Sequence, residues 1–405
     1  MQLKTITYIS NKLLHSSDRR YSGVIVKIAV AAVAISISVM LISISVLRGF
    51  QDEITNKIIG FSGHIHVSNF SSNTSLQSDA LVIDANVKKQ IQQLIPGSKV
   101  TSYAVKGGII KTKTEIEGAV LKGVDTNFDW SFFKDNLMEG TLPNINNDSI
   151  HEVIISKSTA SKLQFKVGDN MLMYFIQQPA RIRKFKITGI YNTGLEEFDN
   201  KFIICGINNI QKLNNWRNQQ ADAYEITLPK KADLKQSTEL LYNNLPSNLN
   251  VESVEDLFPQ LFDWLDLQNL NVLIIIVMML LVGTLNMITA LLIIILEKTK
   301  TVGLLKAMGA SNADIRKIFV INSSKLIFKG AVIGNCVGIL LILIQHYLHV
   351  IPLDASSYYM HYVPTKIDVI NILLINVGSI SISIICMVIP SLIIQNISPA
   401  KVIRF

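Results

Sequence analysis

The stretch LQNLNVLIIIVMMLLVGTLNMITALLIIILEKTKTVGLLKAMGASN (267–312) joins thirty residues without a charged side chain to a short basic segment. About 20 apolar residues are enough to cross the hydrocarbon core of a bilayer, and core helices of soluble proteins rarely stay uncharged for so long. We therefore expect residues 267–296 to span a membrane and residues 297–312 to mark the place where the chain leaves it.

The composition of the whole chain agrees with a membrane protein. Of its 405 residues 49% are hydrophobic and 17% are charged, whereas about a quarter of a globular domain is normally charged. Three further uncharged runs, apart from histidines, cover 28–47, 330–353 and 369–400. The first is too long and begins too late for a cleaved signal peptide. We predict four transmembrane helices, at 24–47, 269–296, 326–348 and 369–395.

The distribution of charge predicts the orientation. Residues 48–266 contain 23 Lys and Arg against 25 Asp and Glu, so the rest of the chain holds 15 basic and five acidic residues. Because basic residues collect in cytoplasmic segments, both termini (1–23 and 396–405) and the segment 297–325 are expected in the cytoplasm. The domain 48–268 and the loop 349–368 then face the other side. The net charge reflects this topology, and no nucleic-acid partner is expected.

The domain between the first two spans has a repeated pattern. A strand–helix–strand order occurs near its start and again near its end, which predicts an α+β layer formed by pairing the two halves. A small β subdomain, at about 130–205, is inserted between them, and Pro179 marks a hairpin tip because proline cannot donate within a ladder. The predicted strand, helix and strands are 64–70, 85–97 and 98–125 in the first half and 223–229, 232–246 and 249–254 in the second.

Motifs for catalysis are absent from the sequence. There is no phosphate-binding loop, no nucleophile elbow, no HExxH and no paired CxxC. His64 and His66 share one face of a strand, but without a nearby third ligand we interpret them as structural histidines rather than as a metal site. A lone Cys205 has no matching ligands around it. We expect a non-catalytic chain without a metal or cofactor.

The basic segment 297–312 combines helix signals in a small space. Val302, Leu305 and Met308, with Leu304, are expected to form one apolar side of a short helix over 298–308. Gly309 supplies a left-handed C-cap, and Ser311 with Asp314 predicts a capping box that starts the next helix. Two interpretations stay open on composition alone: a helical hairpin on the membrane surface, or a lever that docks into a moving partner.

These residues resemble the cytoplasmic coupling element of ABC-transporter permeases of the FtsX and MacB type, which reads E-[KR]-x-x-x-[IV]-G-[IL]-[LM]-[KR]-A-[LM]-G-A. Thr301 stands where the family often has an acidic residue. A second stretch, LRGFQDEITNKIIGFSGHIHV (47–67), is similar to the junction after the first span in the lipoprotein-releasing permeases LolC and LolE, with Arg48 in place of the usual Asn. The residues assigned to ATPase coupling by the first resemblance are Glu297, Lys298, Val302, Gly303, Leu305, Lys306, Ala307, Met308, Gly309 and Ala310.

The resemblance covers the whole chain and implies a function. It implies a permease subunit in the bacterial inner membrane that couples ATP hydrolysis by a separate LolD-like ATPase to the release of lipoproteins. Closing of the ATPase would push on the coupling element, whose apolar side enters a cleft while Lys306 meets acidic rims. The implied partners are a second permease chain, identical or related, membrane lipid, the lipoprotein cargo and a LolA-like periplasmic carrier.

In such permeases a longer hairpin catches the carrier, which assigns Gln177, Gln178, Pro179 and Arg181 to carrier binding here. A plain structural hairpin is the alternative for these residues. For the whole chain, the alternatives are an FtsX/MacB-type permease for efflux or for control of a periplasmic enzyme, and a membrane receptor or scaffold without an ATPase.

Overall fold

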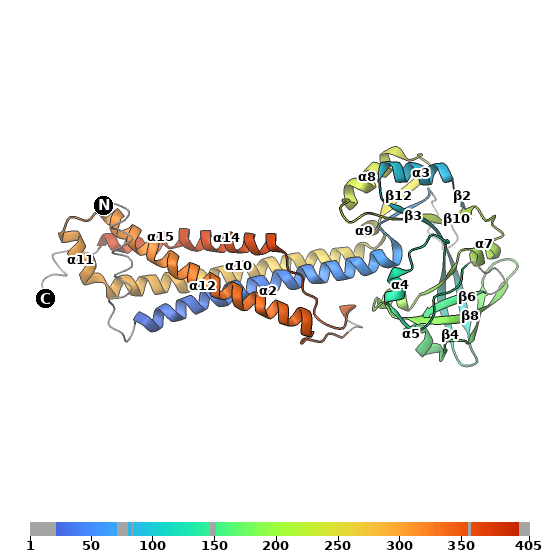
Figure 1. Cartoon of the computed structure of the whole chain (residues 1–405), viewed down its shortest axis with the longest axis horizontal. Helices are drawn as coiled ribbons and strands as arrows, with labels where there is room; N and C mark the ends of the chain where they lie inside the picture. Colours follow the sequence, from blue (N-terminus) through green and yellow to red (C-terminus); the bar gives the residue numbers. More distant parts are fainter. Residues whose placement is uncertain (1–21, 71–79, 83, 146–150, 355–357, 397–405) are drawn as a thin grey trace. The chain divides into compact units, whose positions relative to one another are not determined.

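The computed structural model describes residues 22–70, 80–82, 84–145, 151–354 and 358–396 (Figure 1). The predicted cytoplasmic ends, 1–21 and 397–405, lie outside these residues. The chain divides into two compact units. We call them the helical unit (Met1–Gln51, Trp264–Pro352 and Tyr362–Phe405) and the sheet domain (Asp52–Asp263 and Leu353–His361).

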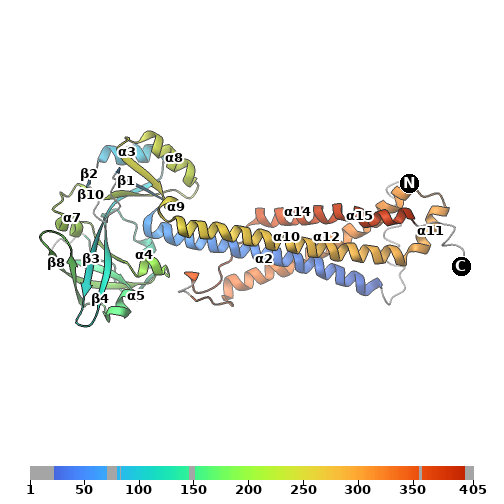
Figure 2. The same cartoon turned by 180° about the vertical axis from the view of Figure 1, so that it is seen from behind.

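Long apolar helices build the helical unit (Figure 2). Within the described residues four helices have the length and hydropathy to cross a membrane, with mean hydropathies of 2.3 to 2.6. The four apolar helices predicted from the sequence are therefore present, while the limits of their spanning parts stay a prediction. The bounds are α2 (Ser22–Ser62), α10 (Pro259–Glu297), α11 (Thr299–Ala307), α12 (Asn312–Leu348), α14 (Val369–Cys386), α15 (Val388–Ser391) and the 3₁₀ helix η1 (Leu392–Asn396).

Small residues bring α2 and α12 close together. A Cβ atom on Gly334 of α12 would lie 2.6 Å from the Ala34 carbonyl oxygen of α2, so only glycine fits there. The Ser38 hydroxyl lies 2.8 Å from the Gly334 carbonyl oxygen and 2.9 Å from that of Ala34. Close backbone approach at small residues is a common way to pack helices in a membrane. It explains why α2 is the most buried of the four long helices.

A pair of asparagines joins α12 to α14. The Asn335 side-chain nitrogen donates to the Asn376 side-chain oxygen at 2.6 Å, and Asn376 donates back to Asn335 at 2.8 Å. Each amide also donates to a carbonyl one turn earlier in its own helix. Polar side chains that would be costly in hydrocarbon are thus satisfied by each other.

The sheet domain is built on a mixed ten-stranded sheet, counted over the described residues. The strand order is β12-β1-β11-β3-β4-β9-β6-β8-β5, and β7 pairs with both β3 and β8. The bounds are β1 (Ile65–Asn69), β3 (Lys99–Lys111), β4 (Ile116–Val124), β5 (Leu137–Gly140), β6 (Glu152–Ser156), β7 (Asn170–Phe175), β8 (Arg181–Tyr191), β9 (Phe202–Gly206), β11 (Ala223–Thr227) and β12 (Leu249–Ser253). A separate pair consists of β2 (Leu81–Val82) and β10 (Gln220–Ala221).

The two halves of the domain pair as the sequence pattern predicts. Strand β1 lies between β11 and β12, and β11 pairs on its other side with β3. Helices α3 (Ala85–Leu94) and α8 (Leu234–Asn244) contact each other and cover this part of the sheet (Figure 1). Their buried Ile91 and Leu241 share one hydrophobic core with Ile65 and Ile226.

The inserted region shares both its core and its sheet with β3 and β4. Strands β6 to β9 pack with α5 (Lys157–Leu163) and α7 (Asn208–Asn214) around a second apolar cluster that includes Phe175 and Phe185. Strand β9 pairs in parallel with β4, and β7 pairs with β3. The insertion therefore extends the sheet of the two halves. The remaining short helices are α4 (Ser131–Asp135), α6 (Glu196–Asp199) and α9 (Val254–Leu257).

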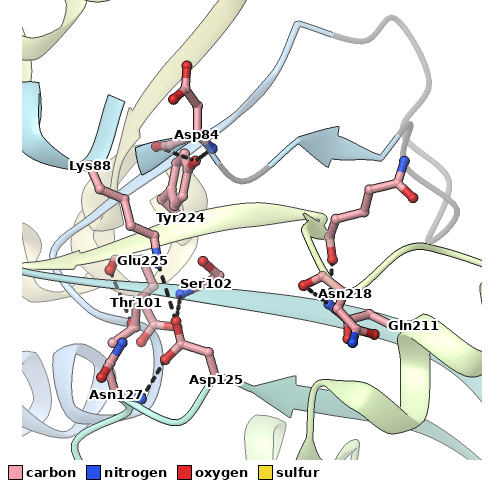
Figure 3. A network of polar contacts seen from close by, with 11 residues as sticks. Asp84, Lys88, Thr101, Ser102, Asp125, Asn127, Gln211, Asn218, Tyr224 and Glu225 are labelled. Carbon is pink, nitrogen blue, oxygen red and sulfur yellow. Dashed lines mark hydrogen bonds and ion pairs between the residues drawn. The ribbon is translucent and has the colours of Figure 1, made fainter. Parts of the chain in front are cut away.

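A polar network fixes α3 to the sheet (Figure 3). The Tyr224 hydroxyl accepts from the Asp84 backbone nitrogen at 2.7 Å, directly before α3 begins. Lys88 on α3 lies 3.5 Å from the Asp125 carboxylate, which also accepts from the backbone nitrogen of Ser102 at 2.8 Å. The helix is held at its start and along its first turn.

Within the sheet domain, the last turns of α2 are joined to the sheet by a buried lysine. The Lys122 ammonium lies 2.9 Å from the Glu225 carboxylate, donates to the Phe61 carbonyl oxygen at the end of α2, and stands over the Phe61 ring. Both charged side chains are almost fully buried. Removal of one partner of such a pair leaves an uncompensated charge, which typically costs about 3–5 kcal/mol. This pair therefore fixes the last turn of α2 to the sheet within the sheet domain.

Candidate functional site around helix α11

Helix α11 begins where α10 ends, at a break of one residue. Lys298 has non-helical backbone angles, and α11 follows from Thr299 (Figure 1). The Thr299 hydroxyl donates to the Leu296 carbonyl oxygen at 2.6 Å and so satisfies one of the last carbonyls of α10. Glu297 is exposed and Lys298 is half-buried at this turn.

The end of α11 is a complete Schellman motif, as the position of Gly309 predicts. Gly309 has a φ of +89°. Its backbone nitrogen donates to the Lys306 carbonyl oxygen, and that of Ala310 donates to Leu305, both at 3.0 Å. Ala310 also packs against the apolar cluster that contains Leu305. The direction in which α11 points is thus set by the left-handed turn at Gly309.

The next helix begins with the predicted cap. The Ser311 hydroxyl accepts from the Asp314 backbone nitrogen at 3.1 Å and lies 2.8 Å from the Asp314 carboxylate. Ser311 is the N-cap of α12. Two capped turns in succession hold α11 between α10 and α12 with little freedom.

One face of α11 is buried in the helical unit. Val302, Gly303 and Leu305 are buried, and the first and last of these belong to the same apolar cluster as Ile315, Phe319 and Met387. We expected Leu305 to enter a cleft on a partner together with Met308. In the structure Leu305 is 8% exposed and belongs to this cluster, whereas Met308 is exposed, so the two side chains lie on different faces; docking of Leu305 into a partner stays a prediction.

The opposite face of α11 is exposed and apolar. Leu304 and Met308 are 55% and 69% exposed, and Ala307 is exposed beside them. Residues four apart lie above each other on a helix, so Leu304 and Met308 form one surface. We call Leu304, Ala307 and Met308 the exposed face of α11. Exposed Lys300 adds a positive charge next to it.

Lys306 connects α11 to the end of the last apolar helix. Its ammonium group donates to the Ile394 carbonyl oxygen at 2.7 Å and lies 3.4 Å from that of Gln395, both in η1. A cation at the carbonyl end of a helix is favourable because the last carbonyls are unpaired and the helix dipole is negative there. The sequence assigns Lys306 to an acidic rim on a partner, which stays a prediction; in this structure its ammonium group joins α11 to η1.

The second predicted site, the hairpin tip, is the turn between β7 and β8. Arg181 donates to the carbonyl oxygens of Lys212 and Leu213 at 2.7 and 3.0 Å and to the Asn215 side chain at 2.7 Å. Gln177 donates to the Leu213 carbonyl oxygen at 3.1 Å. Two of the four assigned residues therefore bind the end of α7, while Gln178 and Pro179 are exposed.

Buried titratable groups of the sheet domain have structural surroundings. The His64 Nδ1 accepts from the Leu228 backbone nitrogen at 3.2 Å, and burial lowers the pKa of His64 to about 4. His66 is buried against Tyr103, 2.7 Å from its hydroxyl, and burial also lowers the pKa of His66. Burial raises the pKa of the Cys205 thiol. Among the described residues no group of three potential metal ligands occurs.

One residue of the site was not among the residues assigned from the sequence. Leu304 completes the exposed face. The sequence predicts one apolar side that holds Leu304 together with Val302, Leu305 and Met308, and the structure corrects this, because Leu304 and Met308 are exposed while the other two are buried. The signal was available: Leu304 and Met308 are four apart, while Val302 and Leu305 are three apart and about 100° further round the helix. Two apolar stripes on a nine-residue helix indicate one face for the core and one for a partner.

Two family models together cover most of the chain. The model of the MacB-like periplasmic core domain matches residues 28–242, and that of the FtsX-like permease C-terminal domain matches residues 273–399. The second match contains α11, the turn at Gly309, the N-cap of α12 and η1.

Relatives of similar length align with most of the chain. The chain is 23% identical to the lipoprotein-releasing system transmembrane protein LolC of Buchnera aphidicola subsp. Schizaphis graminum, over 95% of this chain and 94% of that one. It is 21% identical to LolC of Neisseria meningitidis serogroup B, over 98% of both chains. It is 20% identical to the lipoprotein-releasing system transmembrane protein LolE of Haemophilus influenzae, over 89% of both.

Four apolar helices, a MacB-like core domain on a mixed sheet and an FtsX-like C-terminal part thus occur in one chain. The chain is a membrane protein that belongs to the family of FtsX-like ABC-transporter permeases with a MacB-like periplasmic core domain.

Proposed function

We propose that this chain is the permease subunit of a transporter that releases lipoproteins from the bacterial inner membrane, driven by a separate cytoplasmic ATPase. The observation that carries the proposal is the two-faced helix α11. Its inner face is anchored in the helical unit by Val302 and Leu305, and its outer face presents Leu304 and Met308. A helix with one docking face and one anchored face can transmit a displacement from a bound partner to the helical unit.

The mechanism follows from the contacts of α11. An ATPase that closes on the exposed face would move α11 as one body, because the turn at Gly309 fixes its C-terminal end and Lys306 is bonded to η1. The displacement would then reach α12 through Leu305 and Phe319, and the last helix through Ile394. Full burial of Leu304 and Met308 by a partner would contribute roughly 1.5–3 kcal/mol each.

The nature of the cargo is inferred from the relatives. The full-length relatives are named as lipoprotein-releasing system proteins, which favours lipoproteins over small exported molecules. In this proposal the sheet domain lies in the periplasm, both termini lie in the cytoplasm, and a second permease chain completes the transporter. The exposed hairpin residues Gln178 and Pro179, beside the 75% exposed Ile176, would receive a periplasmic carrier protein.

The proposal is tested by reconstitution. The chain is purified alone and with the ATPase that co-purifies with it in mild detergent, and both preparations are placed in vesicles with a fluorescent acylated lipoprotein. We expect background ATP hydrolysis by the chain alone, and ATP-dependent release of the lipoprotein into the soluble fraction by the complex. Release of a non-acylated control protein, or none of the acylated one, would contradict the assignment of the cargo.

A further inference from the structure

The end of α12 and the residues after it carry an unusual cluster of exposed apolar side chains. Tyr347, Leu348, Val350 and Ile351 are between 54% and 74% exposed. We call these four residues the strap patch. The strap is the part of the α12–α14 connection that belongs to the helical unit, residues 349–352 and 362–368. The strap patch therefore covers the last two residues of α12 and the beginning of the strap. Contiguous exposed apolar groups on a folded segment usually mark a binding surface.

The strap is a built structure. The Gln345 side-chain oxygen accepts from the Ile351 backbone nitrogen at 3.0 Å, and its nitrogen donates to the Val363 carbonyl oxygen at 3.0 Å. Val363 in turn donates from its backbone nitrogen to the Ile351 carbonyl oxygen at 3.1 Å. His349 closes α12 in the left-handed conformation, with a φ of 47°. These bonds hold the side chains of the patch in place.

The strap lies at the level where α2 changes from apolar to polar. The Ser45 hydroxyl donates to the Lys366 carbonyl oxygen at 2.8 Å, and the Lys366 backbone nitrogen donates to the Ser45 carbonyl oxygen at 3.0 Å. A Cβ atom on Gly49 would lie 2.6 Å from the Pro364 backbone. The uncharged run of α2 ends between these contacts, before Arg48.

Helix α10 changes character at the same level. The side chain of Gln51, close to the strap contacts of α2, donates to the Asn269 side-chain oxygen at 3.0 Å. The uncharged run of α10 begins directly after Asp266. Two helices of the helical unit, α2 and α10, therefore pass from apolar to polar at the same level, and the strap contacts α2 at that boundary.

We propose that the strap patch inserts into the headgroup–acyl boundary of the lipid bilayer and anchors this end of the helical unit in one leaflet. The occupant is a lipid surface because the patch continues the lipid-facing run of α12, in which Leu340 is also exposed, up to the polar boundary. Tyrosine prefers this depth, since its ring lies among acyl chains and its hydroxyl among headgroups. Two exposed histidines, His346 and His349, are neighbours of the patch in the sequence.

The inference rests on the membrane placement in the proposed function, and not on its cargo or its ATPase. If the membrane placement and the lipoprotein cargo are both correct, the strap enters the leaflet that contains the acyl chains of the cargo, next to α2. A fixed apolar wedge there would disturb lipid packing where a lipoprotein has to leave.

Depth-dependent quenching tests the proposal. Cys336 and Cys386 are replaced by alanine, while the buried Cys205, whose thiol pKa is raised, reacts too slowly to need replacement. Leu348→Cys and Ile351→Cys are then labelled with a polarity-sensitive fluorophore in vesicles of phosphatidylcholine brominated near the headgroup or deep in the chain. Leu340→Cys is the lipid-facing control, and Lys157→Cys, exposed on the sheet domain, is the water-facing one.

We expect the labels at 348 and 351 to lose fluorescence, and to lose more with the shallow bromines than with the deep ones. The label at 340 should show the reverse order, and the label at 157 no loss. Unquenched labels at 348 and 351 beside a quenched 340 would overturn the proposal; a red-shifted emission would then indicate water, and a blue-shifted one a second copy of the chain. An unquenched label at 340 would overturn the membrane placement itself, whereas failed lipoprotein release leaves this measurement unaffected.

Discussion

Helix α11 and the hairpin tip at 176–181 are both exposed segments that a basic side chain ties to the carbonyl end of another helix. Lys306 binds the Ile394 carbonyl oxygen of η1, and Arg181 binds those of Lys212 and Leu213 at the end of α7. The two segments differ in how they are attached to the protein beneath them. Helix α11 also buries Val302 and Leu305, whereas the hairpin tip is held by polar bonds.

The difference separates two kinds of surface. A segment with a buried apolar face moves together with the core under it, since interiors are closely packed and transmit strain. A tip held by a few hydrogen bonds can change its outer residues without disturbing the core. We therefore assign force transmission to α11 and selective binding to the hairpin, and the following predictions test that division.

The largest expected effect separates the two faces of α11. Leu305→Ala removes buried methyl groups and should destabilise the helical unit by about 2–5 kcal/mol. Met308→Ala changes an exposed side chain and should stay within about 0.5 kcal/mol, yet weaken ATPase binding by about 2 kcal/mol if Met308 is an interface anchor. Thermal unfolding in detergent and ATPase titration measure the two quantities. Equal destabilisation by both variants would show that α11 has no free face.

The hairpin tip should become more mobile when the hydrogen bonds of Arg181 are removed. Arg181→Ala removes three hydrogen bonds from a charged donor group, each worth about 1.5–3 kcal/mol at most and less where solvent reaches it. We expect faster hydrogen exchange at 176–181 and at the end of α7, with the rest of the sheet unchanged. Arg183→Ala, two residues along the same strand, is the matched control. Faster exchange throughout the sheet domain would mean that the tip is part of the core.

The turn after α11 gives a smaller effect with a defined sign. Gly309→Ala places a side chain at a φ of +89° and should cost about 1 kcal/mol. The destabilisation does not come from a steric clash, because no atom lies within 4 Å of the new Cβ. Gly378→Ala in α14 meets equally open space at a helical φ and should stabilise by about 0.4–1 kcal/mol. Melting shifts of the same sign in both variants would contradict the role assigned to the turn.

The smallest expected effect is the pH dependence of the free energy of unfolding of the sheet domain, because two buried groups contribute to it with opposite signs. Burial lowers the pKa of His64 to about 4 and raises the pKa of Asp199 to about 6. Between pH 4 and 6 the unfolded chain binds more protons at His64, so this residue makes the free energy of unfolding rise with pH. The folded chain binds more protons at Asp199, so this residue makes it fall.

Single substitutions should uncover the two opposing slopes. With His64→Gln the free energy of unfolding should fall more steeply from pH 4 to 6 than in the parent chain, and with Asp199→Asn it should rise more steeply. Urea titrations across this range measure both. Identical slopes in the parent and the two variants would show that neither group titrates as its surroundings indicate.

Much of the fold follows from local sequence patterns. The apolar runs are long enough to identify the four helices, and Gly309, Ser311 and Asp314 predict both turns around α11, because each cap needs a particular residue type. The repeated strand–helix–strand order also predicts that the two halves pair in one layer, and the structure shows this as the pairing of β1 with β11 and β12.

The parts that could not be predicted depend on contacts between distant residues. Nothing near Lys306 indicates that it binds η1, 88 residues further along the chain. Likewise, Arg181 finds its carbonyl partners on α7, and the inserted strands join the main sheet through β9 and β4. The family motif includes both Leu304 and Leu305, and only their exposed fractions in the structure show that Leu304 faces outward and Leu305 inward.

The central claim is that the exposed face of α11 is the docking surface for the ATPase. Co-purification of the ATPase tests it most directly, with Met308→Asp compared with replacement of Gln178 and Pro179 by Gly and Ser. We predict that Met308→Asp loses the ATPase and lipoprotein release while the chain still enters the membrane, and that the hairpin variant keeps both the ATPase and its ATP turnover. A Met308→Asp chain that retains a fully active ATPase and supports release would contradict the account.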